Sequence, residues 1–379
     1  MNWEKKLQSM MEVKFNDLQS QWKEIKDCAQ HRINNLFTSC AFTNGPDVEI
    51  FEKNFSHWNG NKYTIGVSSG TEAIRISLES LNLEGEVQVY TSANTCIATV
   101  FAAEMAFGEK CNIHLIDHDD FFLMDVQELE KSLITNHKKG HNIIIPVHLY
   151  GQCCNMSKIS QLAKEFNSII VEDCAQAHGC IHKNNKKVGT MGKISAFSCY
   201  PGKNLGAAGD AGIIVTDDLE LADRCKKIRN LGSEKKYIHD IKGGTYRLDT
   251  IQAIILDEKL KHLDKWNKAR INVAEFYKKN INNPLIKTPE LSPLCKKHVY
   301  HIFCLETNKR DEFTKYMNEK NIPTIIHYPI PVELTGAYKY LNQTNINARR
   351  KSKQIVSIPI HPFITDQELR YICNVVNSF

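Results

Sequence analysis

Three short segments of the sequence hold residues whose types and spacing could do chemistry. The first is SSGTEA, Ser68 to Ala73, in which small residues precede the expected start of a helix. Free backbone N–H groups and the dipole at a helix N-terminus bind anions such as phosphate, and Thr71 adds a hydroxyl group. The same residues also fit a plain Ser or Thr cap, which is the more common use of this pattern.

A second segment, IIVEDCAQAHG, places an acid at the end of an apolar run. Asp173 closes the expected strand, and Gln176 follows it closely in the next turn. A carboxylate in this place can bind a metal, hold a base or pair with a protonated ring nitrogen, and it can also cap a turn. The segment alone does not decide between these uses.

The third segment, SCYPGKNLGAAGDAG, sets Lys203 in a glycine-rich loop between two expected strands. It is not a Walker A loop, because Phe197 and Asn204 stand where that motif needs glycine and Ser or Thr. It is not the dinucleotide fingerprint either, since the glycine spacing differs and a strand follows. A lysine in a flexible surface loop is the simplest alternative.

Taken together, the three segments predict a site for pyridoxal 5′-phosphate (PLP). The helix start would bind the phosphate, Asp173 would keep the pyridine nitrogen protonated, and Lys203 would form the Schiff base. The glycines near Lys203 would let the backbone pass close to the cofactor. In open parallel sheets, ligands bind beyond the carboxyl ends of the strands, so the three segments are expected to converge there.

The elements that must position these residues alternate between short apolar strands and helices. The strand candidates are residues 62–67, 87–90, 112–116, 142–147, 168–172, 194–199 and 212–215. This alternation predicts an α/β fold with a parallel sheet covered on both faces. The first sixty residues are expected to form helix and then loop, with a turn at Asn44-Gly45-Pro46 and a helix after it. One long helix over residues 248–281 would lead to a smaller α+β unit at the C-terminal end.

Composition excludes several classes of protein. The chain is 42% hydrophobic and 24% charged, and its net charge of +5 is not gathered into a basic block, so we expect no nucleic-acid partner. No run reaches the ~20 apolar residues of a membrane span, and residues 1–27 lack the apolar core of a signal peptide. We therefore expect a cytoplasmic protein. The thirteen cysteines show no zinc-ligand spacing, so we expect no metal site and small buried thiols instead.

The sequence resembles the DegT/DnrJ/EryC1/StrS sugar aminotransferases, a branch of the fold type I PLP enzymes. The resemblance covers nearly the whole chain and is carried by FNDL, VSSGTEA, VHLYGQ, VEDCAQAHG, SCYPGKNLGAAGDAG, YRLDTIQAIIL, HYPIPVE and SIPIHPF. It implies an aspartate-aminotransferase-like fold with a mostly parallel seven-stranded sheet. It further implies a large PLP-binding domain over residues 1–245, a small domain over 246–379, and a homodimer with shared active sites.

The resemblance also implies roles for individual residues. Lys203 would bind the cofactor covalently and carry the proton between substrate and cofactor. The other cofactor contacts would be Asp173 at the ring nitrogen, Gln176 near the ring hydroxyl, Ala175 against one ring face, and Gly70, Thr71 and Ser198 at the phosphate. Tyr200 and His327 match positions that lie near the sugar in related enzymes. Family dehydratases have histidine in place of this lysine, so Lys203 argues against that branch.

Two positions depart from the family pattern. Cys96 stands where many members stack an aromatic ring on the cofactor, although sulfur can also pack there. Thr245 replaces an asparagine that reaches the phosphate of the other subunit. The segment ANTCIAT resembles the corresponding segment of the subgroup that acts on dTDP-3-keto-6-deoxyhexoses. This resemblance implies glutamate as the amino donor. It also implies that the product is an amino sugar nucleotide for surface polysaccharide or glycoconjugate biosynthesis. A C4-aminotransferase acting on a UDP- or GDP-4-keto sugar and a non-catalytic PLP-fold regulator stay open as alternatives.

Overall fold

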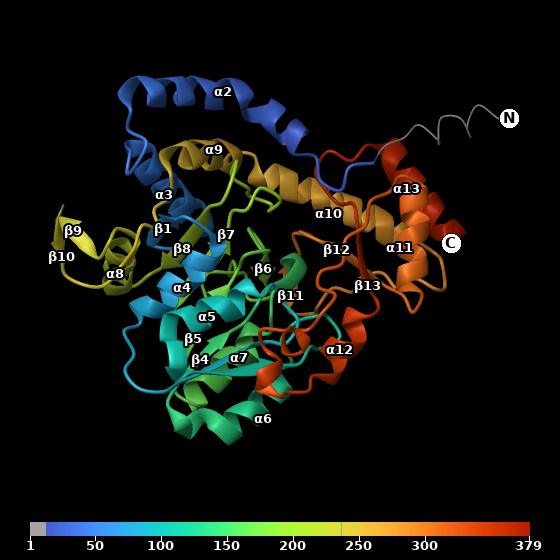
Figure 1. Ribbon diagram of the computed structural model, residues 1–379. Coiled ribbons are helices and arrows are strands. Elements are labelled where there is room, and N and C mark those ends of the chain that lie inside the picture. Colours follow the sequence, from blue (N-terminus) through green and yellow to red (C-terminus); the bar gives the residue numbers. More distant parts are fainter. Residues whose placement is uncertain (1–12, 236) are drawn as a thin grey trace.

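The computed structural model describes residues 13–235 and 237–379. Two helices, α2 (Leu18–Ser39) and α3 (Pro46–Asn59), precede a region in which strands and helices alternate (Figure 1). The strands of this region are β1 (Tyr63–Val67), β2 (Val87–Ser92), β3 (Cys111–Ile116), β4 (His141–Ile145), β5 (Ser168–Asp173), β7 (Ile194–Ser198) and β8 (Gly212–Thr216). Its helices are α4 (Gly70–Ser80), α5 (Ala98–Phe107), α6 (Val126–Asn136), α7 (Met156–Glu165) and α8 (Leu219–Arg229). The predicted alternation is therefore confirmed.

Among the described residues, these seven strands form one sheet in the order β1-β8-β7-β5-β4-β2-β3. The pairs β2–β3, β2–β4, β4–β5 and β5–β7 are parallel, whereas β8 is antiparallel to both β1 and β7. The carboxyl ends of β1, β7, β5, β4 and β2 consequently lie along the same edge. SSGTEA follows β1, Asp173 in IIVEDCAQAHG ends β5, and the lysine loop follows β7, so the expected convergence is confirmed.

Strand β4 shows why the strand sequences read as continuous apolar runs. Ile143 and Ile145 pack on one face of the sheet, with residues of α4, α5 and α8. Ile144 points to the other face, where α6 and α7 cover it. Because successive side chains alternate between faces, a strand covered on both sides needs apolar residues at every position.

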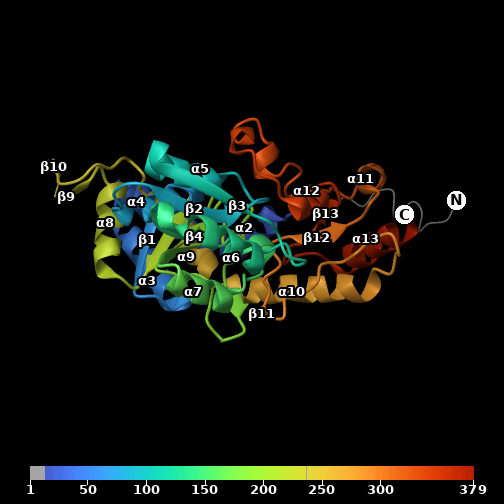
Figure 2. The same cartoon turned by 90° about the horizontal axis from the view of Figure 1, so that it is seen from below.

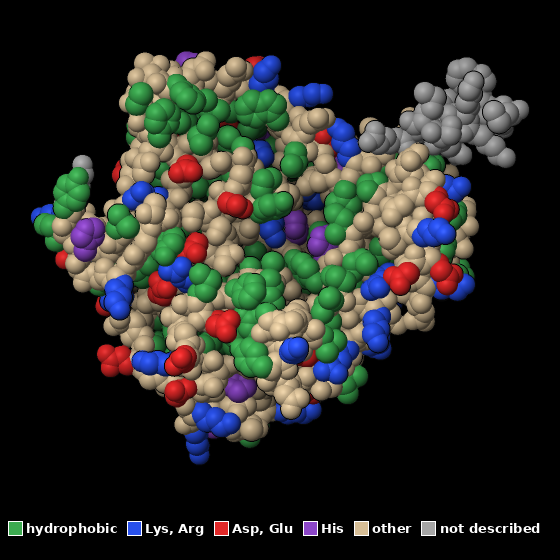
Figure 3. All heavy atoms as spheres, viewed as in Figure 1, with side chains coloured by type: hydrophobic (Ala, Val, Ile, Leu, Met, Phe, Trp, Pro, Cys, Tyr) green, Lys and Arg blue, Asp and Glu red, His purple; other side chains and the backbone are tan. Residues whose placement is uncertain are grey.

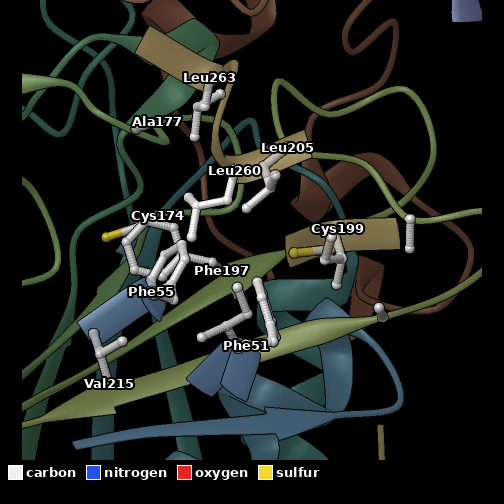
Figure 4. Close-up of a cluster of buried hydrophobic side chains, with 14 of the residues drawn as sticks. Phe51, Phe55, Cys174, Ala177, Phe197, Cys199, Leu205, Val215, Leu260 and Leu263 are labelled. Carbon is white, nitrogen blue, oxygen red and sulfur yellow. The ribbon is translucent and has the colours of Figure 1, made fainter. Parts of the chain in front are cut away.

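The second face is completed by α3 and by α9 (Thr250–Leu260), whose apolar residues pack around β7 (Figure 4). The rings of Phe55 and Phe197 meet nearly edge to face, with centroids 5.4 Å apart, and both side chains are fully buried. Edge-to-face contacts of this kind add stability beyond the buried area. Because Phe197 directly precedes Ser198, this packing fixes the end of β7 next to the lysine loop.

The predicted single helix over residues 248–281 is wrong in one respect. The chain forms two helices, α9 and α10 (Leu263–Asn280), with a break at Lys261 and His262. The break lets α9 pack on α2 and α3, while α10 packs on α13 (Asp366–Ser378). Figure 2 shows α10 beside α13. Apolar residues on both sides of the break are buried, so periodicity alone did not reveal it.

The C-terminal part is a small α+β unit, as predicted. Strands β12 (Phe303–Glu306) and β13 (Ile355–Ile358) pair antiparallel, beside α11 (Arg310–Glu319), α12 (Ile346–Ser352) and α13. The remaining short strands are β6 (Ile181–His182), β9 (Ser233–Lys235), β10 (Ile238–His239) and β11 (Cys295–Lys297). Short 3₁₀ turns lie at Gly108–Lys110, His137–Lys139, Leu149–Gly151, Val332–Leu334 and Lys339–Leu341. The division into domains at residue 245 stays a prediction.

Residues 1–12 lie outside the described part of the chain, so the expectation for the first sixty residues is tested only from residue 13 onward. There, α2 and α3 confirm the helices, and the turn at Gly45 leads into Pro46 at the start of α3. Within the described ranges, no helix has both the length and the apolar character that crossing a bilayer requires.

Candidate active site

A cavity of about 450 Å³ lies at the carboxyl ends of the strands, between the sheet and the small unit. Figure 3 shows a hollow near the middle of this face, with basic and histidine side chains in it. The predicted site residues that line the cavity are Gly70, Thr71, Cys96, Asp173, Ala175, Gln176, Ser198, Tyr200, Lys203 and His327. The structure thus brings together ten residues that are scattered over the sequence.

The start of α4 forms an anion site. Ser69 caps the helix by accepting a hydrogen bond from the Glu72 backbone N–H at 3.1 Å. In the described part of the chain, the backbone N–H groups of Gly70 and Thr71 have no protein acceptor. A Cβ atom on Gly70 would lie 2.4 Å from the Cβ of Ser198, so only glycine allows this close approach. Gly70, Thr71 and Ser198 all line the cavity, so the two free N–H groups and the hydroxyls of Thr71 and Ser198 are available to a phosphate.

Asp173 is buried at the end of β5, with a fixed carboxylate. Its Oδ2 accepts a hydrogen bond from the Thr99 hydroxyl at 2.7 Å, and its Oδ1 accepts one from the Ala175 backbone N–H at 3.0 Å. Each oxygen keeps a lone pair for a further donor. The side chain lines the cavity, so it can receive the N–H of a protonated pyridine ring.

The orientation of the Gln176 amide is set by the backbone. The Tyr150 backbone N–H donates to Gln176 Oε1 at 2.7 Å, and Gln176 Nε2 donates to the Tyr328 hydroxyl at 3.0 Å. A backbone N–H only donates, so the oxygen must face Tyr150 and the NH₂ group must face the cavity side. Gln176 therefore offers a donor, which suits a ring hydroxyl or phenolate.

The loop that carries Lys203 is held at several points and is not a flexible surface loop. The Lys203 backbone N–H donates to the Tyr200 carbonyl at 2.8 Å. Lys259 Nζ donates to the Gly206 carbonyl at 2.6 Å from the buried side. A Cβ atom on Gly206 would lie 2.2 Å from the carbonyl oxygen of Pro201, which explains one glycine of the loop. The backbone thus holds the lysine at a fixed place.

Burial lowers the pKa of Lys203 below the ordinary value for lysine, and the nearby acidic groups of Cys96, Asp173 and Cys199 oppose this shift. Among the described residues, no hydrogen bond or ion pair joins its Nζ to another side chain. A lysine of this kind reaches the neutral, nucleophilic form more readily than a surface lysine does.

The other side of the cavity is formed by the small unit. His327 Nδ1 lies 2.9 Å from Ser357 Oγ, and burial together with the positive charge of Lys203 lowers the pKa of His327 to about 4. Tyr200 is 59% exposed at the mouth of the cavity, which leaves its ring available to a ligand. Cys96 is exposed beside them, so a thiol stands at the position where many family members have an aromatic ring.

Thr245 does not join these residues. It is exposed, it pairs with Asn230 in an isolated bridge, and it does not line the cavity of its own chain. The contact predicted for it is with the site of a second subunit, so its role stays a prediction.

Several residues of the site were not found from the sequence. Thr99 fixes Asp173, and Tyr328 contacts Gln176 although 152 positions separate the two. Thr99 lies in the segment ANTCIAT, where Cys96 drew attention instead, and Tyr328 adjoins His327 in HYPIPVE. The only signals for Thr99 and Tyr328 in the sequence were therefore their positions close to Cys96 and His327.

Three buried cysteines also meet without any local motif. The Sγ atoms of Cys153, Cys180 and Cys295 lie within 4.8 Å of one another, and those of Cys180 and Cys295 are 3.7 Å apart. In the part of the chain that the structure describes, no fourth His, Cys or carboxylate ligand joins this group. The cysteines belong to the apolar cluster around Phe197, and we interpret them as core packing.

The cavity fits PLP group by group. Around it lie an anion site, a buried carboxylate, an oriented amide donor and a lysine with lowered pKa. The unpartnered N–H groups of Gly70 and Thr71 fit its phosphate, and the free lone pairs of Asp173 fit its ring nitrogen. This combination on a mostly parallel α/β sheet defines a PLP-dependent enzyme with the aspartate-aminotransferase-like fold.

Comparison with known proteins gives the same result. The DegT/DnrJ/EryC1/StrS aminotransferase family model matches residues 23–377. The chain is 37% identical over 369 residues to dTDP-3-amino-3,6-dideoxy-alpha-D-galactopyranose transaminase of Aneurinibacillus thermoaerophilus, covering 97% of this chain and 99% of the relative.

Solved structures agree as well. The structure of S. venezuelae DesV in complex with a ketimine intermediate has a TM-score of 0.90 at 33% identity, covering 97% of this chain and 98% of that one. The structure of ntda from Bacillus subtilis with bound cofactor PMP has a TM-score of 0.87 at 27% identity, covering 97% and 85%. The chain belongs to the DegT/DnrJ/EryC1/StrS aminotransferase family, whose enzymes depend on PLP.

Proposed function

We propose that this enzyme transfers the amino group of L-glutamate to the C3 keto carbon of a dTDP-linked 3-keto-6-deoxyhexose. The observation that supports the proposal is the cavity itself, which Lys203, Asp173 and the start of α4 all line. The relative from Aneurinibacillus thermoaerophilus, which acts on a dTDP-3-amino sugar, supports the choice of nucleotide and position. The amino sugar would serve surface polysaccharide or glycoconjugate biosynthesis.

When bound, PLP supplies the electron sink that makes the substrate Cα–H acidic. The protein's own residues then do the rest. Asp173 would keep the ring nitrogen protonated through a charge-assisted hydrogen bond, and the hydrogen bond from Thr99 would keep the carboxylate in place. Gln176 would donate a hydrogen bond to the ring hydroxyl. Lys203, whose pKa is lowered by burial, would accept the proton from the substrate Cα and deliver it to C4′ of the cofactor.

The mouth of the cavity is suited to a sugar nucleotide. Tyr200 is exposed there and can lie along the sugar ring, while His327 faces the cavity as a neutral imidazole at pH 7, because its pKa is about 4. A neutral imidazole exchanges hydrogen bonds with sugar hydroxyls without adding charge. We assign Tyr200 and His327 to the sugar on this basis.

We further propose a homodimer in which Thr245 of one subunit approaches the phosphate site of the other. Its exposure and its distance from its own cavity support this arrangement. Members of this fold that complete their sites across a two-fold axis need the second copy for activity.

The test is a panel of keto-sugar nucleotides that differ in nucleotide (dTDP, UDP, GDP) and in keto position (C3, C4), each incubated with enzyme, PLP and L-glutamate. Mass spectrometry detects amination and NMR locates the new amine. We expect turnover with the dTDP-3-keto sugar and none with Lys203→Ala. Turnover confined to a 4-keto sugar would replace the C3 assignment, and binding of PLP without any turnover would favour a regulatory protein.

A further inference from the structure

His301 lines the same cavity, and the residues that hold it form a hydrogen-bond chain whose direction is fixed at two points. Asn267 Nδ2 donates to the backbone carbonyl of His178 at 2.8 Å. Asn204 Nδ2 donates to the carbonyl of Val299 at 3.1 Å and to Asn267 Oδ1 at 2.8 Å. Because a carbonyl oxygen only accepts, neither amide can be turned over without setting two oxygens against each other.

The fixed amides determine the protonation of His301. Its Nδ1 lies 3.2 Å from Asn204 Oδ1, an oxygen that has lone pairs and no hydrogen. Nδ1 must therefore carry the proton and donate it to Asn204. In a neutral imidazole the other nitrogen is then an acceptor, so Nε2 presents a lone pair.

The imidazole is neutral at physiological pH. Burial lowers the pKa of His301 well below its ordinary value, and the positive charges of Lys203 and Arg270 lower it further, with His327 and His178 acting in the same direction. Of these neighbours, Lys203 lines the cavity as well and directly precedes Asn204 in the chain. One residue, Asn204, thus ties the lysine loop to the imidazole.

We propose that His301 is the acceptor for Lys203, receiving an Nζ–H bond whenever this lysine is an ammonium group. The inference rests on the proposed function in one respect, namely that Lys203 carries a proton during turnover. A carboxylate in this place would stabilise the ammonium strongly and keep the lysine from acting as a base. A neutral imidazole orients the ammonium but stabilises it less than a carboxylate would, so the lysine can release its proton again.

The arrangement gives His301 a role that packing alone would not require. Lys203 Nζ has no hydrogen-bond partner among the described residues, and the Nε2 atom of His301 is held in its tautomer by contacts on the far side of the ring. Both residues line one cavity, so the flexible chain of Lys203, once freed from the cofactor, would turn its Nζ toward a lone pair that is already in place. His301 would therefore be a catalytic residue that the motifs did not reveal.

The first test measures the tautomer in the cofactor-free protein. Nitrogen-15 NMR of labelled histidines distinguishes a protonated Nδ1 from a protonated Nε2, and His301→Gln identifies the signal. We expect a neutral Nδ1–H form that persists from pH 8 to pH 5. A protonated Nε2, or an imidazolium at pH 7, would overturn the proposal without any need for an inactive variant.

The second test measures the apparent pKa of Lys203 in the cofactor-free protein, by competitive acetylation over a pH series and peptide mass spectrometry. Loss of a hydrogen bond to a charged group should lower this pKa by about one unit in His301→Phe, or in His301→Leu if the former does not fold. His301→Gln keeps an acceptor and should restore most of the shift.

The matched control is His178→Gln. Both ring nitrogens of His178 lack partners in the described structure, and only its backbone carbonyl takes part in the chain, so the Lys203 pKa should stay within about 0.3 units. Equal values in wild type, His301→Phe and His178→Gln would overturn the proposal. Both tests use protein without cofactor or sugar, so a failure to aminate any sugar nucleotide would refute the proposed function and leave these results standing.

Discussion

Replacing Gly70 by alanine should damage the phosphate site and little else. The new Cβ would lie 2.4 Å from Ser198 Cβ and 2.9 Å from Ser198 Cα. Ordinary carbon–carbon contacts are about 3.5–4.0 Å, so the start of α4 and the end of β7 must separate by about 1 Å. The backbone of Ser198 is part of a central strand and cannot yield easily, which leaves the helix start to move.

The size of the effect follows from the donors that move. The N–H groups of Gly70 and Thr71 and the Ser198 hydroxyl can no longer converge on one phosphate. Hydrogen bonds to charged groups contribute about 1.5–3 kcal/mol each. Weakening two of them should cost about 2–3 kcal/mol, which corresponds to a 30- to 150-fold higher Kd for PLP.

The assay compares two ligands in the Lys203→Ala background, where binding is not covalent. Kd is measured by tryptophan fluorescence for PLP and for pyridoxal, which has the same ring without the phosphate. We expect Gly70→Ala to weaken PLP binding and to leave pyridoxal binding nearly unchanged. The control is Gly202→Ala in the lysine loop, whose Cβ would find its nearest neighbour at 3.8 Å and should change neither Kd by more than about threefold.

Two outcomes would refute the reasoning. If Gly70→Ala bound PLP as tightly as its parent while folding normally, the phosphate would not lie at the start of α4. If both ligands were weakened equally, the damage would have spread to the ring site, and the specific role of the helix start would be lost.

Three further predictions follow from other contacts. Glu172 is fully buried and accepts hydrogen bonds from His148 Nε2 (2.9 Å) and from three backbone N–H groups (2.6–3.0 Å). Glu172→Ala should therefore lower the free energy of unfolding, measured by urea titration, by about 3–5 kcal/mol. A loss below about 1 kcal/mol would contradict this. Burial, aided by the charge of Lys203, lowers the pKa of His178 to about 3, so its unfolded form binds a proton below about pH 6.5 while its folded form does not. Stability should therefore fall between pH 7 and pH 5, by about 2 kcal/mol from this residue, and His178→Gln should remove that part of the slope. Finally, Thr245→Glu and Lys203→Ala should each abolish activity. When the two variants are mixed, about half of the dimers contain one subunit of each and hold one intact site of two, so about a quarter of the activity should return. No recovery would contradict a shared site.

The sequence predicted the site where the relevant residues are neighbours in the chain. SSGTEA, the end of β5 and the lysine loop each carry a local pattern, and the parallel alternation implied that they would meet at one edge. Partners brought together by folding left no such pattern. Asn204 and Asn267 are 63 positions apart, and nothing in their neighbourhoods indicated that they would fix the tautomer of His301. Only the assembled fold shows this chain of donors.

The break between α9 and α10 illustrates a second limit. Leu260 and Leu263 are both buried, so the apolar pattern continues without interruption across Lys261 and His262. The change of direction comes from the two different surfaces that these helices cover, α3 on one side and α13 on the other. Periodicity reports which residues are buried, but it does not report against which element they pack.

Transfer of nitrogen from glutamate to a sugar nucleotide, carried by the cofactor with Lys203 moving the proton, is the central activity proposed for this enzyme. The most direct measurement incubates the PLP-loaded enzyme with L-[¹⁵N]glutamate and the dTDP-3-keto-6-deoxyhexose, and follows the label by NMR and mass spectrometry. We predict ¹⁵N bonded to C3 of the sugar, with no transfer in Lys203→Ala. Retention of all ¹⁵N in glutamate, with this and every other sugar nucleotide of the panel, would contradict the account.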